Sequence, residues 1–341
     1  MNDQAYRKMT ALIFSLPEQL ATGQALAARC RLFPGGAIDR VVVSAMGGSA
    51  IGGDVARILL EQEANVPVVV QRDYLLPPWV TAQTLVVAIS YSGNTEETLT
   101  AYAAAKRKRA KIITITSGGK LAEKARQDGV PLLIIPGGLP PRCALGLVSI
   151  PLLVILNRLG VCRSYEPDIR ETVRLLQKNL PGWSRWARRV SRNLSGCFFI
   201  VYSTSRLLDM AAYRWQCQLN ENAKMLAHWG TLPEQSHNEL MGYGAPAELN
   251  QKIALVALID RTTHPRTILR LKQMIWLIDD VLSEKLVLTA AGRTALARLF
   301  SIIVRGDLLS VELARQRGVD PMVIPKIDLL KQTLARRKEG R

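Results

Sequence analysis

The sequence lacks the features of a membrane protein, of a secreted protein and of a zinc-binding protein. Its longest nearly uncharged apolar run, 144–156, is too short to span a bilayer and predicts a buried helix. Residues 1–7 mix acidic and basic side chains, without the apolar core of a signal peptide. The five cysteines are scattered, with no CxxC pair and no histidine at ligand spacing, so neither a metal site nor a disulfide framework is expected. We therefore predict a cytoplasmic protein with no membrane partner.

Acidic residues are scarce beside basic ones, with 28 Asp and Glu against 45 Lys and Arg and a net charge of +17. The basic residues are spread over 106–111, 185–192, 261–272 and 336–341. No helix-turn-helix, zinc-finger or aromatic RNA-binding pattern accompanies them. We expect solvated helix faces and no nucleic-acid partner, with a modest attraction for anionic substrates.

Two series of short apolar runs, rich in β-branched residues and bounded by Gly, Pro or Ser, predict two sets of strands. The expected strands are 40–45, 67–71, 85–90, 111–116 and 131–135, then 197–202, 253–259 and 285–289. Helical patterns occupy 54–63, 94–109, 121–127, 207–227, 266–277, 292–312 and 329–337. A basic connector between the two series, 169–194, is expected to form two helices broken at Pro181 and Gly182.

Continuous apolar strands that alternate with helices predict parallel sheets covered on both faces. A chain of 341 residues is too long for one small core and suits two such domains. The predicted fold class is therefore α/β, with two doubly wound parallel-sheet lobes and the active site between them. We place the first lobe at residues 1–180 and the second at 181–341.

A glycine-rich turn follows the first predicted strand and opens a helix. It reads Met46-Gly47-Gly48-Ser49-Ala50-Ile51-Gly52-Gly53-Asp54. Gly47 and Gly48 let backbone N–H groups approach a ligand, and a helix N-terminus favours an anion. The spacing is neither GxGxxG nor a Walker loop, so no cofactor is expected. Taken alone, the turn could equally be a tight strand-to-helix connection.

A second polar loop, 90–97, also runs from a strand into a helix and reads Ser-Tyr-Ser-Gly-Asn-Thr-Glu-Glu. Asn94 with Glu97 could form an ordinary helix cap. A cap does not explain the hydroxyls of Ser90, Ser92 and Thr95 together. Hydroxyls and helix amides in this arrangement suit a phosphate group bound without a metal ion.

These loops resemble the sugar isomerase (SIS) domain, whose Ser and Thr loop binds sugar phosphates. Further segments narrow the resemblance to the bifunctional phosphoglucose/phosphomannose isomerase family of archaea and bacteria, over essentially the whole chain. They are Pro141-Arg142-Cys143-Ala144-Leu145-Gly146, Leu219-Asn220-Glu221-Asn222-Ala223-Lys224, Ser236-His237-Asn238-Glu239-Leu240 and Leu330-Lys331. The resemblance implies two SIS-like lobes that interconvert an aldose phosphate and a ketose phosphate.

Such a reaction needs a group that opens the sugar ring, a base that moves a proton between C1 and C2, and a cation that stabilises the enediolate. The resemblance implies Glu221 as the base, and the planar donors of Arg142 suit the delocalised anion. By resemblance His237 takes part in ring opening, reaching into the site of a partner subunit in a homodimer. Lys331 assists by resemblance, with Lys326 as the alternative lysine.

Glucose 6-phosphate and fructose 6-phosphate are the expected substrates. Mannose 6-phosphate is less certain, because Ile324 precedes Pro325 where the family commonly has a threonine. A sugar-phosphate sensor with the same fold is the alternative function, although no separate DNA-binding domain is recognisable. An amino-sugar enzyme fits these segments less well.

Overall fold

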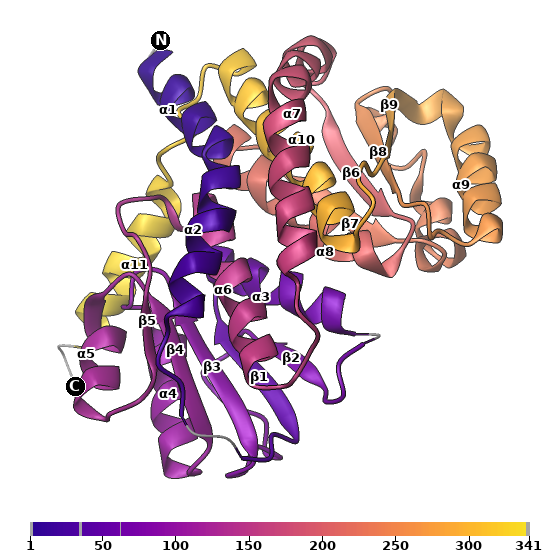
Figure 1. The fold of residues 1–341 in the computed structure, drawn as a ribbon. Helices are drawn as coiled ribbons and strands as arrows, with labels where there is room; N and C mark the ends of the chain where they lie inside the picture. The colour runs from indigo at the N-terminus through magenta and orange to yellow at the C-terminus, as the bar shows by residue number, and fades with distance from the viewer. Residues whose placement is uncertain (1–2, 34–35, 62, 339–341) are drawn as a thin grey trace.

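A computed structural model describes residues 3–33, 36–61 and 63–338 (Figure 1). The strands are β1 (Arg40–Ala45), β2 (Val68–Gln71), β3 (Thr84–Ser90), β4 (Lys111–Thr116), β5 (Leu132–Ile134), β6 (Phe198–Ser203), β7 (Ala227–Thr231), β8 (Ile253–Ile259) and β9 (Leu282–Thr289). The helices of the first part are α1 (Asp3–Phe14), α2 (Leu16–Ala28), α3 (Gly47–Leu60), α4 (Glu96–Arg107), α5 (Gly119–Gln127) and α6 (Leu145–Arg158). Those that follow are α7 (Glu166–Val190), α8 (Arg206–Gln218), α9 (Pro265–Leu277), α10 (Ala295–Gln316) and α11 (Pro325–Lys338).

The strands form two sheets in which every paired neighbour is parallel. The first has the order β2-β1-β3-β4-β5 and the second the order β7-β6-β8-β9. In the first sheet the chain passes from β1 to β2 on one side and then to β3 on the other side of β1. In the second sheet it passes from β6 to β7 and then to β8 on the other side of β6. Loops that diverge at such a switch point leave a crevice outside the carboxyl ends of the strands. The predicted class, α/β with two doubly wound parallel lobes, is confirmed.

The apolar core is continuous between the two sheets. Alternate side chains of a strand point to opposite faces. On the inner faces, Val43 of the first sheet and Val201 of the second belong to one buried cluster, together with residues of α2, α3, α6, α7, α8 and α10. These helices lie between the sheets (Figure 1). On the outer faces, separate clusters lie under α4 and α5 and under α9.

The predicted break at Pro181 and Gly182 is wrong, because α7 continues through both residues. Leu176, Leu180 and Ala187 bury one side of this helix in the main core. Pro181 is exposed, so the carbonyl group that loses its helical hydrogen bond can be hydrated instead. Packing of the apolar side therefore outweighs the local cost of proline. The domain boundary between residues 180 and 181 falls inside α7 and stays a prediction.

The predicted helix 207–227 is wrong in its last part. Helix α8 ends at Gln218, a wider π-helical turn follows over Leu219–Ala223, and β7 begins at Ala227. Lys224 has a left-handed backbone with φ of 56°, which ends the helix. Helices α1 and α2 were not predicted at all. Gly23 in α2 lies so close to Gly146 and α6 that a Cβ there would be 2.9 Å from the Gly146 carbonyl oxygen.

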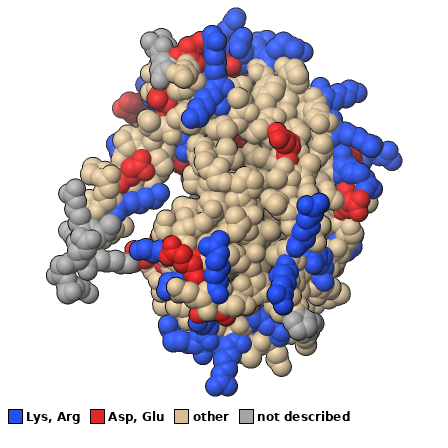
Figure 2. All heavy atoms as spheres, turned by 60° about the vertical axis from the view of Figure 1, so that its left-hand side comes forward, with Lys and Arg blue, Asp and Glu red and all other residues tan. Residues whose placement is uncertain are grey.

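The basic residues of the runs 106–111, 185–192 and 261–272 are exposed as predicted, apart from half-buried Lys111, whereas the side chains of 336–341 lie outside the described residues. The outer side of α7 exposes Arg174, Lys178 and Arg185. On the face in Figure 2, Lys and Arg gather near the edges and the centre is largely uncharged. Among the described residues, no helix combines the length and apolar character needed to cross a membrane. All five cysteines are free, and none of them forms a disulfide.

Candidate active site

The two predicted ligand loops lie together at the carboxyl ends of β1 and β3. Ser49 is buried, and its Oγ accepts a hydrogen bond of 3.1 Å from the backbone N–H of Tyr91. Within the second loop, Ser90 Oγ lies 2.8 Å from Thr95 Oγ1 and also accepts the Thr95 N–H at 3.4 Å. Ser92 is exposed. Parallel neighbours bring hydroxyls from both loops to one edge of the sheet.

The helix cap considered for Asn94 and Glu97 is not formed. Helix α4 begins at Glu96, and its N-cap residue, Thr95, makes no side-chain cap hydrogen bond. The Asn94 side chain instead accepts the backbone N–H of Lys120 at 3.2 Å and so joins this loop to α5. Since the Thr95 side chain does not cap the start of α4, the positive dipole end of this helix favours an anion at the loop.

The glycine-rich turn contacts the loop that carries Arg142. A Cβ placed on Gly48 would lie 2.7 Å from the carbonyl oxygen of Pro141 and 3.0 Å from the backbone nitrogen of Arg142. Gly47 has a left-handed φ of 50°, and a Cβ placed on it would meet nothing within 4 Å. Glycine is therefore needed at 48 for close packing, whereas at 47 it is favoured by the backbone conformation.

Arg142 is buried and held by neutral oxygen atoms. Its Nε donates to Asn222 Oδ1 at 2.8 Å, and its Nη2 donates to the carbonyl oxygens of Pro321 at 2.6 Å and Met322 at 3.0 Å. The remaining edge faces Glu221, with 3.5 Å between Nη1 and Oε2. The Arg142 side chain is 5% exposed and that of Glu221 is 28% exposed, so the carboxylate is the more accessible partner.

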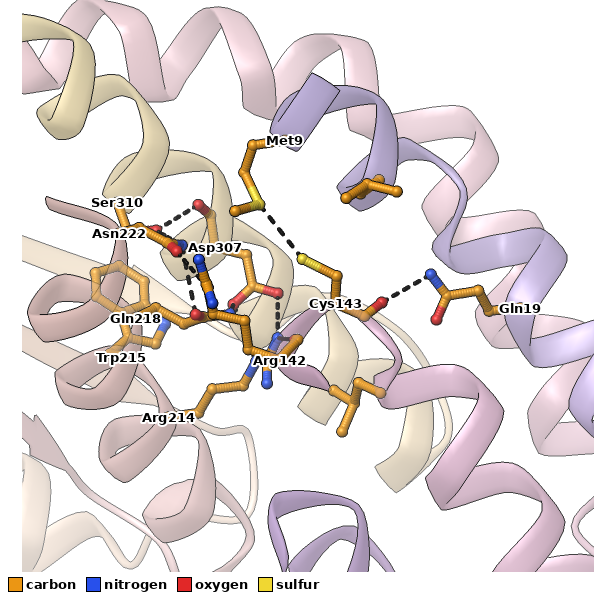
Figure 3. Close-up of polar contacts among 12 residues, drawn as sticks. Met9, Gln19, Arg142, Cys143, Arg214, Trp215, Gln218, Asn222, Asp307 and Ser310 are labelled. Atoms are coloured by element: carbon orange, nitrogen blue, oxygen red, sulfur yellow. Dashed lines mark hydrogen bonds and ion pairs between the residues drawn. The ribbon is translucent and has the colours of Figure 1, made fainter. Parts of the chain in front are cut away.

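A network of buried polar side chains connects Arg142 with the second lobe (Figure 3). Arg214 on α8 makes a two-pronged ion pair with Asp307 on α10, at 3.0 and 2.8 Å, and donates to the carbonyl oxygen of Arg142 at 2.9 Å. Gln218 also donates to Asp307, and Asn222 donates to Ser310 at 2.9 Å. Arg214 and Asn222 therefore hold the Arg142 loop directly, and their own bonds to Asp307 and Ser310 connect it to α10.

Lys224 ties the turn that carries Glu221 to the segment before α11. Its ammonium group donates to the carbonyl oxygens of Glu221 at 2.6 Å, Asp320 at 2.9 Å and Val323 at 2.8 Å. Burial, with help from the nearby positive charge of Arg142, lowers the pKa of Lys224 below its usual range. Segment 320–323 thus accepts hydrogen bonds from both Arg142 and Lys224 and leads directly to Ile324 and α11.

His237 and Lys331 lie apart from this cluster in the single chain. His237 is exposed in a short 3-10 turn, Glu234–His237, which follows β7. Lys331 and Lys326 are exposed on α11. Within the described residues, the side chains of His237 and Lys331 form no hydrogen bond and no ion pair. The structure therefore brings together Arg142 and Glu221, with the hydroxyl loops adjoining, but not the two predicted ring-opening groups.

Sequence reasoning missed the residues that position Arg142 and the turn that carries Glu221. Asn222 and Lys224 stand in the same segment as Glu221, so the motif itself could have suggested them. Arg214 and Asp307 are 93 positions apart on two long helices, where a single charged residue predicts only a solvated face. The thiol of Cys143, beside Arg142, is kept protonated because burial raises its pKa to about 11.

Comparisons with known proteins find relatives that match both lobes of the chain. Residues 37–135 match the SIS domain, and residues 184–334 match the bacterial phospho-glucose isomerase C-terminal SIS domain. A bifunctional phosphoglucose/phosphomannose isomerase of Caldicellulosiruptor bescii is 39% identical over 96% of this chain and 99% of its own. A D-glucosamine-6-phosphate 4-epimerase of Sulfolobus acidocaldarius is 32% identical over 85% of this chain and 88% of its own.

A solved structure shows the same fold at a greater sequence distance. The C-terminal domain of glucosamine-fructose-6-phosphate aminotransferase from Francisella tularensis superposes with a TM-score of 0.68 at 17% identity. The alignment covers 93% of this chain and 98% of that one. With a relative 39% identical over nearly its full length, this chain belongs to the bifunctional phosphoglucose/phosphomannose isomerase family.

Proposed function

We propose that the protein is an aldose–ketose isomerase that interconverts glucose 6-phosphate and fructose 6-phosphate. The observation that carries this proposal is the pair formed by Arg142 Nη1 and Glu221 Oε2, 3.5 Å apart, beside hydroxyl-bearing loops. It supplies an accessible carboxylate and a fixed cation, which are the two groups needed to move a proton next to a carbonyl. Family membership supports the same substrates.

In this proposal the phosphate group of the substrate lies on the first lobe. The backbone of Gly47 and Gly48 and the hydroxyls of Ser49, Ser90, Ser92 and Thr95 surround it. The uncapped start of α4 adds partial positive charge at the same place, so no metal ion is required. Because Ser49 and Ser90 are buried and already hydrogen-bonded, they shape the loops, and exposed Ser92 contributes the more accessible hydroxyl.

Glu221 then removes the proton from C2 of the open-chain aldose. The C2–H electrons form the C1–C2 double bond, and the carbonyl electrons move onto O1 as an enediolate oxygen. Arg142 stabilises that negative charge with the guanidinium edge that faces Glu221. Return of the proton from Glu221 to C1, with transfer of the O2 proton to O1, gives the ketose. No external oxidant is needed.

Ring opening requires groups that this chain does not place beside Glu221. We propose that the enzyme is a cytoplasmic homodimer in which His237 of one subunit enters the site of the other, with Lys331 assisting. Both side chains are exposed, and neither forms a hydrogen bond in the described part of the chain. This supports a role across an interface. We include mannose 6-phosphate as a further substrate of this proposal, and Ile324 stands beside the segment held by Arg142 and Lys224.

Replacing Glu221 with glutamine tests the proposal. The variant keeps the size of the side chain and the hydrogen bond from Lys224 to the backbone carbonyl of residue 221, but it cannot accept the C2 proton. We expect kcat to fall by about 10²–10⁴-fold with fructose 6-phosphate, and KM to change little. Glu123→Gln, an exposed acid on α5, is the matched control and should retain full turnover. Undiminished turnover in Glu221→Gln would remove the base from the mechanism.

A further inference from the structure

The second sheet has a switch point that corresponds to the one in the first. In the first sheet, β1 and β3 are neighbours, and their carboxyl ends carry the two ligand loops. In the second sheet, β6 and β8 hold the same relation, with the chain leaving β6 towards β7 on the far side. Ligand crevices form where the connections diverge in this way. The second lobe should therefore have a crevice after Ser203 and Ile259.

A cavity of about 560 Å³ lies at this place, well within the size that holds a small molecule. Its walls come from the segment after β6, including Thr204 and Ser205, and from Thr262, Thr263 and His264 after β8. The carboxyl end of α3, from the first lobe, and the start of α10 close the other sides. None of the residues assigned above to catalysis or substrate binding lines it.

Three polar groups in the cavity wall have unused hydrogen-bonding capacity among the described residues. Ser205 Oγ is inaccessible to solvent and has no partner. Thr267 is 8% exposed, and its hydroxyl makes no hydrogen bond. Arg298 is 5% exposed; its Nε donates to Asp260 at 2.6 Å and its Nη1 to a backbone carbonyl at 2.8 Å, which leaves Nη2 free. Buried polar groups without partners are uncommon, and a ligand would satisfy them.

The electrostatics of the cavity favour an anion. Helices α8 and α9 both begin at its wall, and Ser205 at the N-cap of α8 makes no side-chain cap hydrogen bond. Two arginines and one histidine line the cavity, against a single carboxylate, Glu61. Arg206 is largely exposed and is paired with Glu61 at 2.6 Å and with Asp209 at 3.2 Å, so Arg298 is the cavity's principal donor to an anion. Helix N-termini and guanidinium groups together suit phosphate.

We propose that this cavity is a second binding site, for a small phosphate-bearing ligand, separate from the catalytic site. The phosphate group rests at the start of α8, against the Thr267 hydroxyl, with Arg298 Nη2 as its buried donor. Rotation of the Ser205 side chain about its Cα–Cβ bond brings the unpartnered Oγ into the cavity. The volume leaves room for an attached polyol beside the threonine-lined wall. This site goes beyond the proposed isomerisation and does not depend on it.

Calorimetric titration of the full chain tests the proposal. The probes are inorganic phosphate and glucitol 6-phosphate, which has no carbonyl group and cannot be isomerised. The parent is compared with Ser205→Ala/Thr267→Val, with Ser90→Ala/Thr95→Val in the first lobe, and with Thr100→Val, an exposed control on α4. Both double variants are close to isosteric, and thermal melts verify that each is folded. The single variants Ser205→Ala and Thr267→Val replace the double variant if it does not fold.

We expect two binding events per parent chain. Ser205→Ala/Thr267→Val should raise the Kd of one event by about tenfold or more, and Ser90→Ala/Thr95→Val that of the other. Thr100→Val should bind like the parent. Binding of inorganic phosphate alone identifies the free anion as the ligand, and binding of glucitol 6-phosphate identifies the ester; both support the site. A single event that Ser205→Ala/Thr267→Val leaves unchanged overturns it. Because the titration measures no turnover, failure of the isomerase proposal would leave this result intact.

Discussion

Replacing Gly48 by alanine would test the contact that positions the Arg142 loop. A Cβ at this second residue of α3 would lie 2.7 Å from the carbonyl oxygen of Pro141 and 2.8 Å from its carbonyl carbon. Side-chain carbons essentially never approach backbone atoms so closely, so either α3 or the loop must move. The loop has little freedom, because the Arg142 side chain is hydrogen-bonded to Asn222, Pro321 and Met322.

The magnitude follows from two opposed terms. Overpacking against a fixed backbone costs about 1–3 kcal/mol, whereas alanine gains about 0.5–1 kcal/mol over glycine in a helix. We expect Gly48→Ala to lower the free energy of unfolding by about 1 kcal/mol. The larger effect falls on activity, because a displacement of about 1 Å between Arg142 and Glu221 can reduce the rate about 100-fold. We therefore expect kcat/KM for fructose 6-phosphate to fall between about 10- and 100-fold.

Gly182→Ala in α7 is the matched control, since the nearest atom to its Cβ is the flexible end of Arg185 at 3.9 Å. It should raise the free energy of unfolding by about 0.5–1 kcal/mol and leave kcat/KM unchanged. Urea unfolding followed by circular dichroism, with a coupled isomerase assay, measures both quantities. If Gly48→Ala were as stable and as active as the parent, the contact with Pro141 would have no part in positioning Arg142.

Two further predictions concern the partner subunit and the segment before α11. Mixing His237→Ala with Glu221→Gln, each inactive alone, should restore about a quarter of the parental activity through one intact site in each mixed dimer. No recovery after subunit exchange would place His237 outside the partner's site. Lys224→Met should lower the free energy of unfolding by about 2 kcal/mol, because three carbonyl groups lose a charged donor. It should also speed amide exchange in 320–324, and unchanged exchange there would contradict the anchoring role of Lys224.

Most of the fold was predictable because its strands are short, apolar and β-branched. β1, β4 and β8 have the predicted limits, and the glycine and serine loops follow β1 and β3 as expected. Elements fixed by distant contacts were not predictable. Strand β7, with the sequence Ala-His-Trp-Gly-Thr, has no alternating pattern and forms because it pairs with β6. The continuity of α7 through Pro181 depends likewise on packing that local propensity does not encode.

The candidate site was predictable only in part. The segments around Arg142 and Glu221 identified two residues that the structure brings to 3.5 Å, although they are 79 positions apart. Their supporting residues were hidden, because a helix pattern does not reveal which charged side chain will be buried by a facing helix. His237 and Lys331 still await a test of the partner subunit, because one chain does not bring them to Glu221.

The two buried arginines near Glu221 differ in the charge that they retain. Arg214 shares both oxygens of Asp307, so its positive charge is balanced and its role is to join α8 to α10. Arg142 is held by an amide oxygen and two backbone carbonyls, which fix its position without cancelling its charge. Among the described residues, Glu221 is the one carboxylate paired with this rigid, desolvated cation, which is already oriented for negative charge that develops on a substrate. Neutral partners, and not burial alone, are therefore what distinguish the arginine suited to catalysis from the one suited to structure.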